Sequence, residues 1–312
     1  MMTRLGRAPW PLFVVALALL VPAVGSRFYT FLANDVLIWA LFATSLNLLV
    51  GYTGLVSFGH AAYFGIGAYT TYQFVQWVGG GPGRFWLAAL GGALAVAALG
   101  GLVERLLFRH LYGKEELYQL LFTYALVLIL SDAAKMLWGT QQKSVSRPPE
   151  LSGAFTLFGA TIPSYNLLII LLGPAIALAF WVVLQRTRVG RYIRAAALDR
   201  ETLGALGVNV DALYTWVFVL ASFLGGLGGA LISPMRATTP GMDTEVIVEA
   251  FVVVVIGGLG SFWGTFLGAL IYGQVLSFGI LFFPRFSIFA VFALMAAVLI
   301  VRPWGLLGRP LR

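Results

Sequence analysis

Polar side chains interrupt an apolar stretch near the N-terminal end of the chain, "LNLLVGYTGLVSFGHAAYFGIGAYT" (residues 46–70). Asn47, Ser57 and His60 can each donate or accept hydrogen bonds. Polar groups in apolar surroundings are costly and usually face protein or water, so these three are candidates for the wall of a solute path. For His60, an interhelical hydrogen bond is a commoner role than proton transfer.

A second segment repeats part of the first, because "GLVSF" (54–58) recurs as "GLGSF" (258–262). Glycine in a membrane helix allows close helix approach, or marks a break whose backbone lines a cavity. Packing without solute contact explains any single glycine equally well. Glycine-interrupted segments in two halves are typical of transport pathways, so we predict a parallel internal repeat. The predicted pathway residues are Asn47, Gly54, Ser57, His60, Glu249, Gly258 and Ser261.

Other chemistry is poorly represented in the sequence. The chain has no cysteine and two histidines, which excludes disulfides, thiolate chemistry and a histidine-based metal site. Gly113-Lys114 is followed by glutamate and lacks the upstream glycine of a phosphate-binding loop. Asp132 and Lys135 lie one helical turn apart, and we expect them to neutralise each other. Without a catalytic constellation, we predict that the chain is not an enzyme.

The elements that position these residues are predicted to be membrane helices. Of 312 residues, 60% are hydrophobic and 10% charged, with a mean hydropathy of +0.91. Apolar runs of roughly 15–22 residues approach the length that crosses a bilayer as a helix, and they lack the alternation of barrel strands. We therefore predict an all-α, polytopic helical bundle with about ten spans. The expected spans are about 9–25, 34–50, 56–78, 85–104, 117–138, 165–184, 213–232, 246–257, 261–283 and 286–303.

Two of these spans leave alternatives open, and the charges orient the set. The first resembles a secretory signal but is predicted to be retained, and the eighth is short enough to be broken or re-entrant. With the N-terminus inside, thirteen Lys and Arg fall in cytoplasmic segments and six outside. Both termini are therefore predicted to be cytoplasmic. This distribution explains the net charge of +8 without nucleic acid. Residues 139–164 read as an exposed outer loop, and one membrane domain fills residues 1–312.

The longest cytoplasmic connection, residues 185–212, contains the pattern of a short capped helix. Asp199 is placed to begin it and Gly207 to end it in the left-handed conformation. Arg191 and Arg194 lie one turn apart on a preceding helical segment. A basic cytoplasmic loop explains the arginines but not the short helix, which offers a rigid handle for another protein.

A further cap is expected at the end of this loop, where Asp211 is predicted to begin the next span.

The segment "ETLGALG" (201–207) resembles the EAA-loop motif of the membrane subunits of ATP-binding cassette (ABC) importers. Leu203 departs from the usual alanine, and the later Ile-x-Leu-Pro ending is missing. With its flanks, the loop resembles the permeases of branched-chain amino acid ABC transporters, the Liv type. Residues 46–70 look like the M-type subunit, residues 120–139 look closer to the H-type, and residues 251–273 also fit the family.

This resemblance, over roughly residues 35–303, implies a permease in the cytoplasmic (inner) membrane that carries branched-chain or related amino acids by alternating access. It implies a second permease, a paralogue or another copy, and an extracytoplasmic solute-binding protein. Two ATP-binding subunits would hold ATP and magnesium, leaving this chain without a cofactor. The residues that it places at the ATPase contact are Arg191, Arg194, Asp199, Arg200, Glu201 and Gly207.

Two other functions stay open at this stage. The nearest is a permease for urea, amides or sugars of the same superfamily, because the membrane sequence discriminates poorly among these solutes. The other is an ion- or proton-coupled secondary transporter, which would use titratable residues along its path. Only His60, Glu249 and Asp132 qualify for that role.

Overall fold

The computed structural model describes residues 27–55, 57–79, 81–157 and 160–308, so the predicted first span lies outside the described residues. The long helices are α2 (Arg27–Thr53), α3 (His60–Val78), α4 (Arg84–Leu106), α5 (Glu116–Trp138), α6 (Ser164–Arg186), α9 (Val210–Ile232), α10 (Met242–Gly257), α11 (Phe262–Phe282) and α12 (Ser287–Val301). Shorter elements are α7 (Arg188–Ala196), α8 (Arg200–Ala205), β1 (Ala154–Leu157), β2 (Ala160–Pro163), and 3-10 turns at Phe108–Leu111, Pro149–Leu151 and Pro284–Phe286.

Seven of the described helical segments are long and apolar enough to cross a membrane. They lie in α2, α4, α5, α6, α9, α11 and the segment Pro284–Val301. The prediction of an all-α polytopic membrane protein is therefore confirmed in outline. α3 and the 16-residue α10 correspond to predicted spans but are not among the seven. The count of ten spans and the cytoplasmic termini stay predictions.

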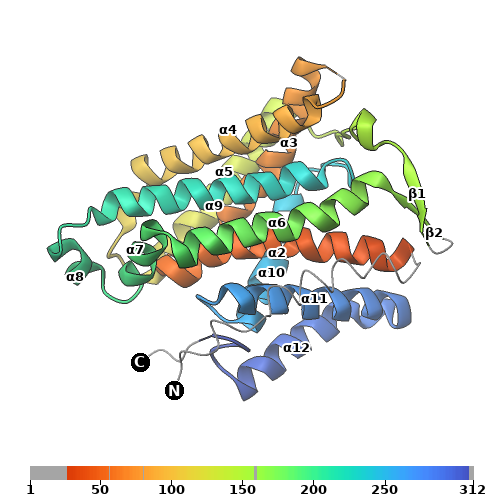
Figure 1. The fold of residues 1–312 in the computed structure, drawn as a ribbon. Helices are drawn as coiled ribbons and strands as arrows, with labels where there is room; N and C mark the ends of the chain where they lie inside the picture. The colour runs from red at the N-terminus through yellow and green to blue at the C-terminus, as the bar shows by residue number, and fades with distance from the viewer. Residues whose placement is uncertain (1–26, 56, 80, 158–159, 309–312) are drawn as a thin grey trace.

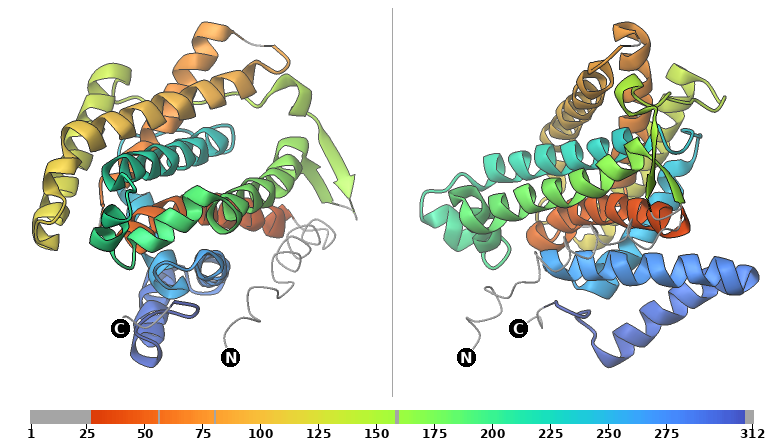
Figure 2. Two further views of the ribbon diagram at one scale, coloured as in Figure 1. Left: turned by 60° about the vertical axis from the view of Figure 1, so that its left-hand side comes forward. Right: turned by 45° about the vertical axis from the view of Figure 1, so that its right-hand side comes forward.

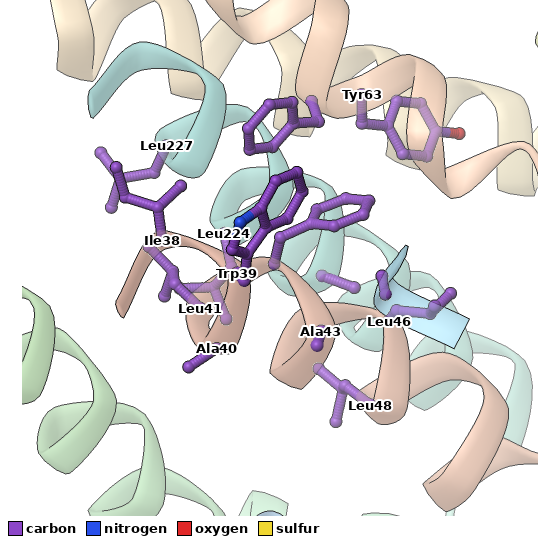
Figure 3. Packing of buried hydrophobic residues seen from close by; sticks show 14 of the residues in the cluster. Ile38, Trp39, Ala40, Leu41, Ala43, Leu46, Leu48, Tyr63, Leu224 and Leu227 are labelled. Carbon is purple, nitrogen blue, oxygen red and sulfur yellow. The ribbon is translucent and has the colours of Figure 1, made fainter. Parts of the chain in front are cut away.

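Helix α2 lies at the centre of the bundle, where it packs against α6, α9, α10 and α11 (Figure 1). In its most apolar window 89% of the residues are buried, against 11% in Pro284–Val301. Figure 3 shows Ile38 and Trp39 of α2 beside Leu224 and Leu227 of α9. Most polar residues of α2 are therefore buried inside the protein, namely Thr30, Asn34, Thr44, Ser45, Asn47 and Thr53.

Close backbone contact joins α9 to α3 and α4. A Cβ added to Gly67 of α3 would overlap the backbone of Gly226 of α9. A Cβ added to Gly100 of α4 would overlap the side chain of Ser222 of α9. Glycine is needed at both positions, so helix packing, one of the two interpretations of the glycines, applies to this part of the bundle.

The bundle has two distinct ends. Helices α7 and α8 lie at one end and the β1–β2 hairpin at the other, while α11 and α12 form a layer on the side of α2 away from α4 (Figures 1 and 2). The hairpin lies within residues 139–164, where an exposed loop was predicted without any strand. Phe155 lies opposite Ile162 and Thr156 opposite Thr161. These aromatic and β-branched pairs favour strands, and they were overlooked among the surrounding turn residues.

Candidate functional site

The glycine that begins each copy of the repeated motif lies in a break between helices. Gly54 follows the last turn of α2 with φ +71°, and Gly258 follows α10 with φ +107°. Both φ values fall where side chains other than glycine are strained, so glycine ends each helix. A Cβ added to Gly51 would overlap the backbone nitrogen of Gly260. The structure therefore brings the end of α2 against the α10–α11 break.

Asn47 fastens these two regions together. Its Nδ2 donates to the carbonyl oxygen of Ser261 at 3.2 Å and to Oγ1 of Thr265 at 2.7 Å. The backbone nitrogen of Gly260 donates to Asn47 Oδ1 at 2.9 Å. Both polar atoms of this buried amide are thus engaged inside the chain, and in this conformation Asn47 is a clamp between α2 and the break.

Ser261 shapes the same break. Its hydroxyl accepts from the backbone nitrogen of Gly264 at 3.1 Å and so caps the start of α11. On the other side, the backbone nitrogens of Leu306 and Leu307 donate to the carbonyl oxygens of Ile256 and Gly257 at 2.9 and 3.0 Å. The segment that follows α12 therefore pairs with the last turn of α10.

His60 begins α3 and is enclosed on every side. Its Nε2 lies 2.8 Å from Ser45 Oγ, and its ring stacks on Phe42 with 5.3 Å between centroids. A Cβ added to Gly225 of α9 would lie 3.3 Å from Nε2, so α9 covers the ring. Among the described residues, Nδ1 has no hydrogen-bond partner. This geometry places His60 between helices and away from any surface.

The segment between α2 and α3 contacts α5 and α10. The backbone nitrogen of Phe58 donates to Thr123 Oγ1 at 3.2 Å, and the Phe58 ring lies 5.0 Å from that of Phe251. Ser57 is buried, whereas Gly54 is exposed. Of the predicted pathway residues, Gly54 alone is exposed in the described structure.

Two acidic residues behave differently on their helices. Glu249 of α10 is half-buried, and its Oε2 lacks a hydrogen-bond partner among the described residues. Asp132 of α5 pairs with Lys135 at 2.8 Å, which confirms the predicted neutralisation. Glu249 therefore remains a predicted pathway residue, and its Oε2 can still accept a hydrogen bond.

The short helix in the long connection is confirmed as α8. Asp199 caps it by accepting from the backbone nitrogens of Glu201 and Thr202, both at 3.0 Å. Gly207 follows its end with φ +84°. The Thr202 hydroxyl, together with these backbone donors, holds the pKa of Asp199 below its usual value. Leu203 is buried and anchors the helix, whereas Leu206 is 76% exposed.

Helix α7 precedes α8 and confirms the predicted helical segment around Arg191 and Arg194. Ile193 is buried, and the guanidinium of Arg194 donates to the carbonyl oxygen of Leu184. Arg191 is exposed. Arg200 of α8 is exposed too, and a Cβ added to Gly113 would lie 3.4 Å from its guanidinium. Arg194 therefore anchors the loop, while Arg191 and Arg200 remain available to a partner.

The predicted cap of α9 was wrong by two residues. Asn209 begins the helix by accepting from the backbone nitrogen of Ala212 at 2.9 Å, and Asp211 lies in the first turn. Asparagine and aspartate are both favoured at N-caps, so spacing alone did not separate them.

Sequence reasoning missed a buried carboxylate near α8. Glu104 of α4 is fully buried and accepts from the hydroxyls of Thr215 at 2.6 Å and Tyr112 at 2.7 Å. Arg109 lies 3.7 Å from Glu104 and donates to Thr215 at 2.9 Å. Burial and, to a smaller extent, the hydrogen bond to Glu104 raise the pKa of Tyr112. A signal was available, because Glu104 is the one acidic residue within the fourth predicted span.

Membrane-length helices around a buried α2, with an exposed capped helix at one end, define a polytopic membrane protein. The sequence profile of a family described as "Branched-chain amino acid transport system / permease component" matches residues 28–301. The chain belongs to this family.

Curated relatives share most of the chain. The high-affinity branched-chain amino acid transport system permease protein BraD of Pseudomonas aeruginosa is 27% identical over 87% of this chain and 92% of its own length. LivH of Escherichia coli, a permease protein of the same description, gives the same three values. The ribose import permease protein RbsC of Haemophilus influenzae is 34% identical over 30% of this chain and 31% of its own. A solved structure, PsaBC from Streptococcus pneumoniae in complex with Fab, has a TM-score of 0.44 and 13% identity, covering 88% of this chain and 91% of that chain.

Proposed function

We propose that this chain is the permease subunit of an ABC importer that carries branched-chain or related amino acids across the cytoplasmic membrane. Family membership and the names of BraD and LivH support the solute class. The proposed assembly contains a second permease, two ATP-binding subunits that hold ATP and magnesium, and an extracytoplasmic solute-binding protein. This chain needs no cofactor of its own in that arrangement.

The observation that carries the proposal is α8. A six-residue helix that is capped at its start, ended by a left-handed glycine and anchored by Leu203 is a rigid surface feature. Its exposed side presents Arg200, Glu201 and Leu206. A partner that pushes this helix moves α9, because only residues 206–209 separate the end of α8 from that span.

The proposed solute path involves the two glycine breaks. In this role Asn47 and Ser261 act by holding the α10–α11 break against α2, and Gly54 and Gly258 allow the chain to turn there. Glu249 is the proposed wall residue, since it is half-buried and its enclosed Oε2 has no hydrogen-bond partner among the described groups. Ser57 and His60 are both buried, so in this proposal they position the residues of the wall and do not contact the solute.

The decisive experiment reconstitutes the chain with its ATP-binding and solute-binding partners in proteoliposomes. Leucine, isoleucine and valine should stimulate ATP hydrolysis and be taken up only when ATP is present. Uptake by this chain alone, driven by an ion gradient, would contradict the ABC mechanism and favour a secondary transporter.

A double variant tests the role of α8. Glu201→Ala combined with Gly207→Pro should uncouple ATP hydrolysis from uptake while membrane insertion stays normal, because proline cannot adopt φ +84°. A matched control is Ser152→Ala, an exposed substitution outside the bundle. Uptake that is unchanged in the double variant would remove the coupling role from α8.

Sugar import is the second candidate. The partial similarity to RbsC, and to the fructose import permease FrcC of Rhizobium meliloti at 33% identity over 39% of this chain, favours it. Ribose and fructose should therefore be included in the uptake assay. Stimulation by either sugar, with none by leucine, would replace the amino acid proposal.

A further inference from the structure

A hollow opens between the end of α4 and the start of α9, away from the predicted solute path. It is open to solvent, with a volume of about 410 Å³, and its polar lining includes Arg105, Arg109, Asp211 and Thr215, beside the indole of Trp216. Trp216 is 68% exposed. The end of α4 and the start of α9, whose residues line the hollow, lie at the end of the bundle that carries α7 and α8 (Figure 1).

An apolar stripe leads along α4 to this hollow. Leu87, Leu94 and Leu102 share one face of the helix and are 55–65% exposed. Arg105 follows Leu87 by 18 residues, which is five turns at 3.6 residues per turn, so it lies on the same face. Exposed leucines on a spanning helix pack against lipid chains. A lipid that covers the stripe would therefore place its headgroup beside Arg105.

The two arginines differ in how they are held. The guanidinium of Arg109 is fixed by Glu104 at 3.7 Å and by Thr215 at 2.9 Å. Glu104 is itself fully buried, so the orientation of Arg109 is set from inside the protein. Arg105 is exposed and has no ion pair or hydrogen bond among the described residues. One arginine is thus pre-oriented and the other is free to close on an anion.

The hollow also offers a place for a positive charge. Asp211 is exposed and forms no ion pair in the described part of the chain. Trp216 adds an aromatic face, which attracts cations. Paired positive and negative groups in one hollow match a ligand that carries both charges.

We propose that this hollow binds the headgroup of a membrane phospholipid, with its phosphate on Arg105 and Arg109 and a primary ammonium on Asp211 and Trp216. Arginine suits a phosphate because its fork of N–H donors matches the phosphate oxygens. Basic pockets between spanning helices recognise lipid headgroups in this way, and tryptophan is enriched at the membrane interface. The primary ammonium of phosphatidylethanolamine donates hydrogen bonds to a carboxylate, which the choline headgroup cannot do.

The test uses the full-length chain in nanodiscs that contain equal amounts of phosphatidylethanolamine, phosphatidylglycerol and phosphatidylcholine with identical acyl chains. Native mass spectrometry counts the lipid molecules that stay bound to the protein after it is released from the nanodisc. The wild type should retain phosphatidylethanolamine preferentially. Arg105→Gln should lower its retention about tenfold, the effect of losing one charge-assisted contact. Arg188→Gln on α7 is the matched control, because Arg188 is exposed at the same end and does not line the hollow.

Two further arms separate the parts of the proposal. Asp211→Asn should shift retention from phosphatidylethanolamine toward phosphatidylglycerol, while equal retention of both by the wild type would overturn the ammonium assignment. Inorganic phosphate in excess should leave the bound lipid in place. Displacement by phosphate, or equal loss in Arg105→Gln and Arg188→Gln, would overturn the lipid site. Thermal unfolding of each variant should match the wild type, since both substituted arginines are exposed.

Discussion

A buried amide in a membrane helix is costly unless its polar atoms have partners, and Asn47 finds them in groups that lie 213 to 218 residues further along the chain. A pattern of polar residues therefore identified an important position but not its task. In the sequence, an amide that contacts solute and an amide that clamps two helices look the same.

The clamp predicts a stability effect. Asn47→Ala should lower the free energy of unfolding by about 1–3 kcal/mol, because the Gly260 backbone nitrogen loses its acceptor inside the protein. Thermal unfolding of the purified chain in detergent measures the change. The double variant Asn47→Ala/Thr265→Val should lose less free energy of unfolding than the sum of the two single losses, since the two side chains share a hydrogen bond. Additive effects would contradict the clamp.

At the scale of elements, the glycine contact between α3 and α9 gives a contrast of two similar substitutions. Gly67→Ala should destabilise the bundle by about 1–3 kcal/mol, because the new methyl group overlaps the Gly226 backbone. Gly91→Ala of α4 is the control, since its methyl group would lie an ordinary 3.4 Å from Phe74. Thermal unfolding should fall for the first and stay near the wild type for the second.

Helix α8 predicts a pH dependence. Hydrogen bonds lower the folded-state pKa of Asp199, so its capping is complete above the unfolded pKa near 3.8 and is lost as pH falls through the lower folded value. Asp199→Ala should speed hydrogen exchange at the Glu201 and Thr202 amides on the order of several-fold at neutral pH. Asp199→Asn should keep the cap without the acid dependence. Equal exchange in all three proteins would show that α8 does not depend on this cap.

Local signals explain which elements sequence could predict. The start and end of α8 depend on Asp199 and Gly207 themselves, so a short window of residues contains the answer. The long helices follow from hydrophobic runs in the same way. The hairpin was overlooked because Phe155 and Ile162 gain from pairing across strands, and turn residues dominate their surroundings.

At the scale of the whole molecule, the candidate site depends on contacts between distant segments. The enclosure of His60 requires Gly225, and the buried Glu104 requires Thr215. In each pair the two residues are far apart in the sequence, so the sequence alone could not reveal these contacts. The repeated motif, by contrast, correctly marked two helix breaks, because glycine in the left-handed region is a local requirement.

The pairing of the segment after α12 with α10 gives a prediction at this scale. Leu306→Pro should lower the free energy of unfolding by about 1–3 kcal/mol, since proline removes the nitrogen-bound hydrogen donated to Ile256. Leu306→Ala keeps that hydrogen and shortens the side chain, so it separates backbone pairing from packing. Denaturant unfolding in detergent compares the two. A proline variant as stable as the alanine variant would show that the backbone pairing contributes little.

The Asn47 clamp has a consequence for how the protein is made. A ribosome synthesises α2 long before Thr265, so α2 enters the membrane while every partner of the Asn47 side chain is still missing. During that interval the amide must be satisfied by water, by its own helix or by the insertion machinery. The contacts that hold α2 against the α10–α11 break can therefore form only after α11 has been synthesised.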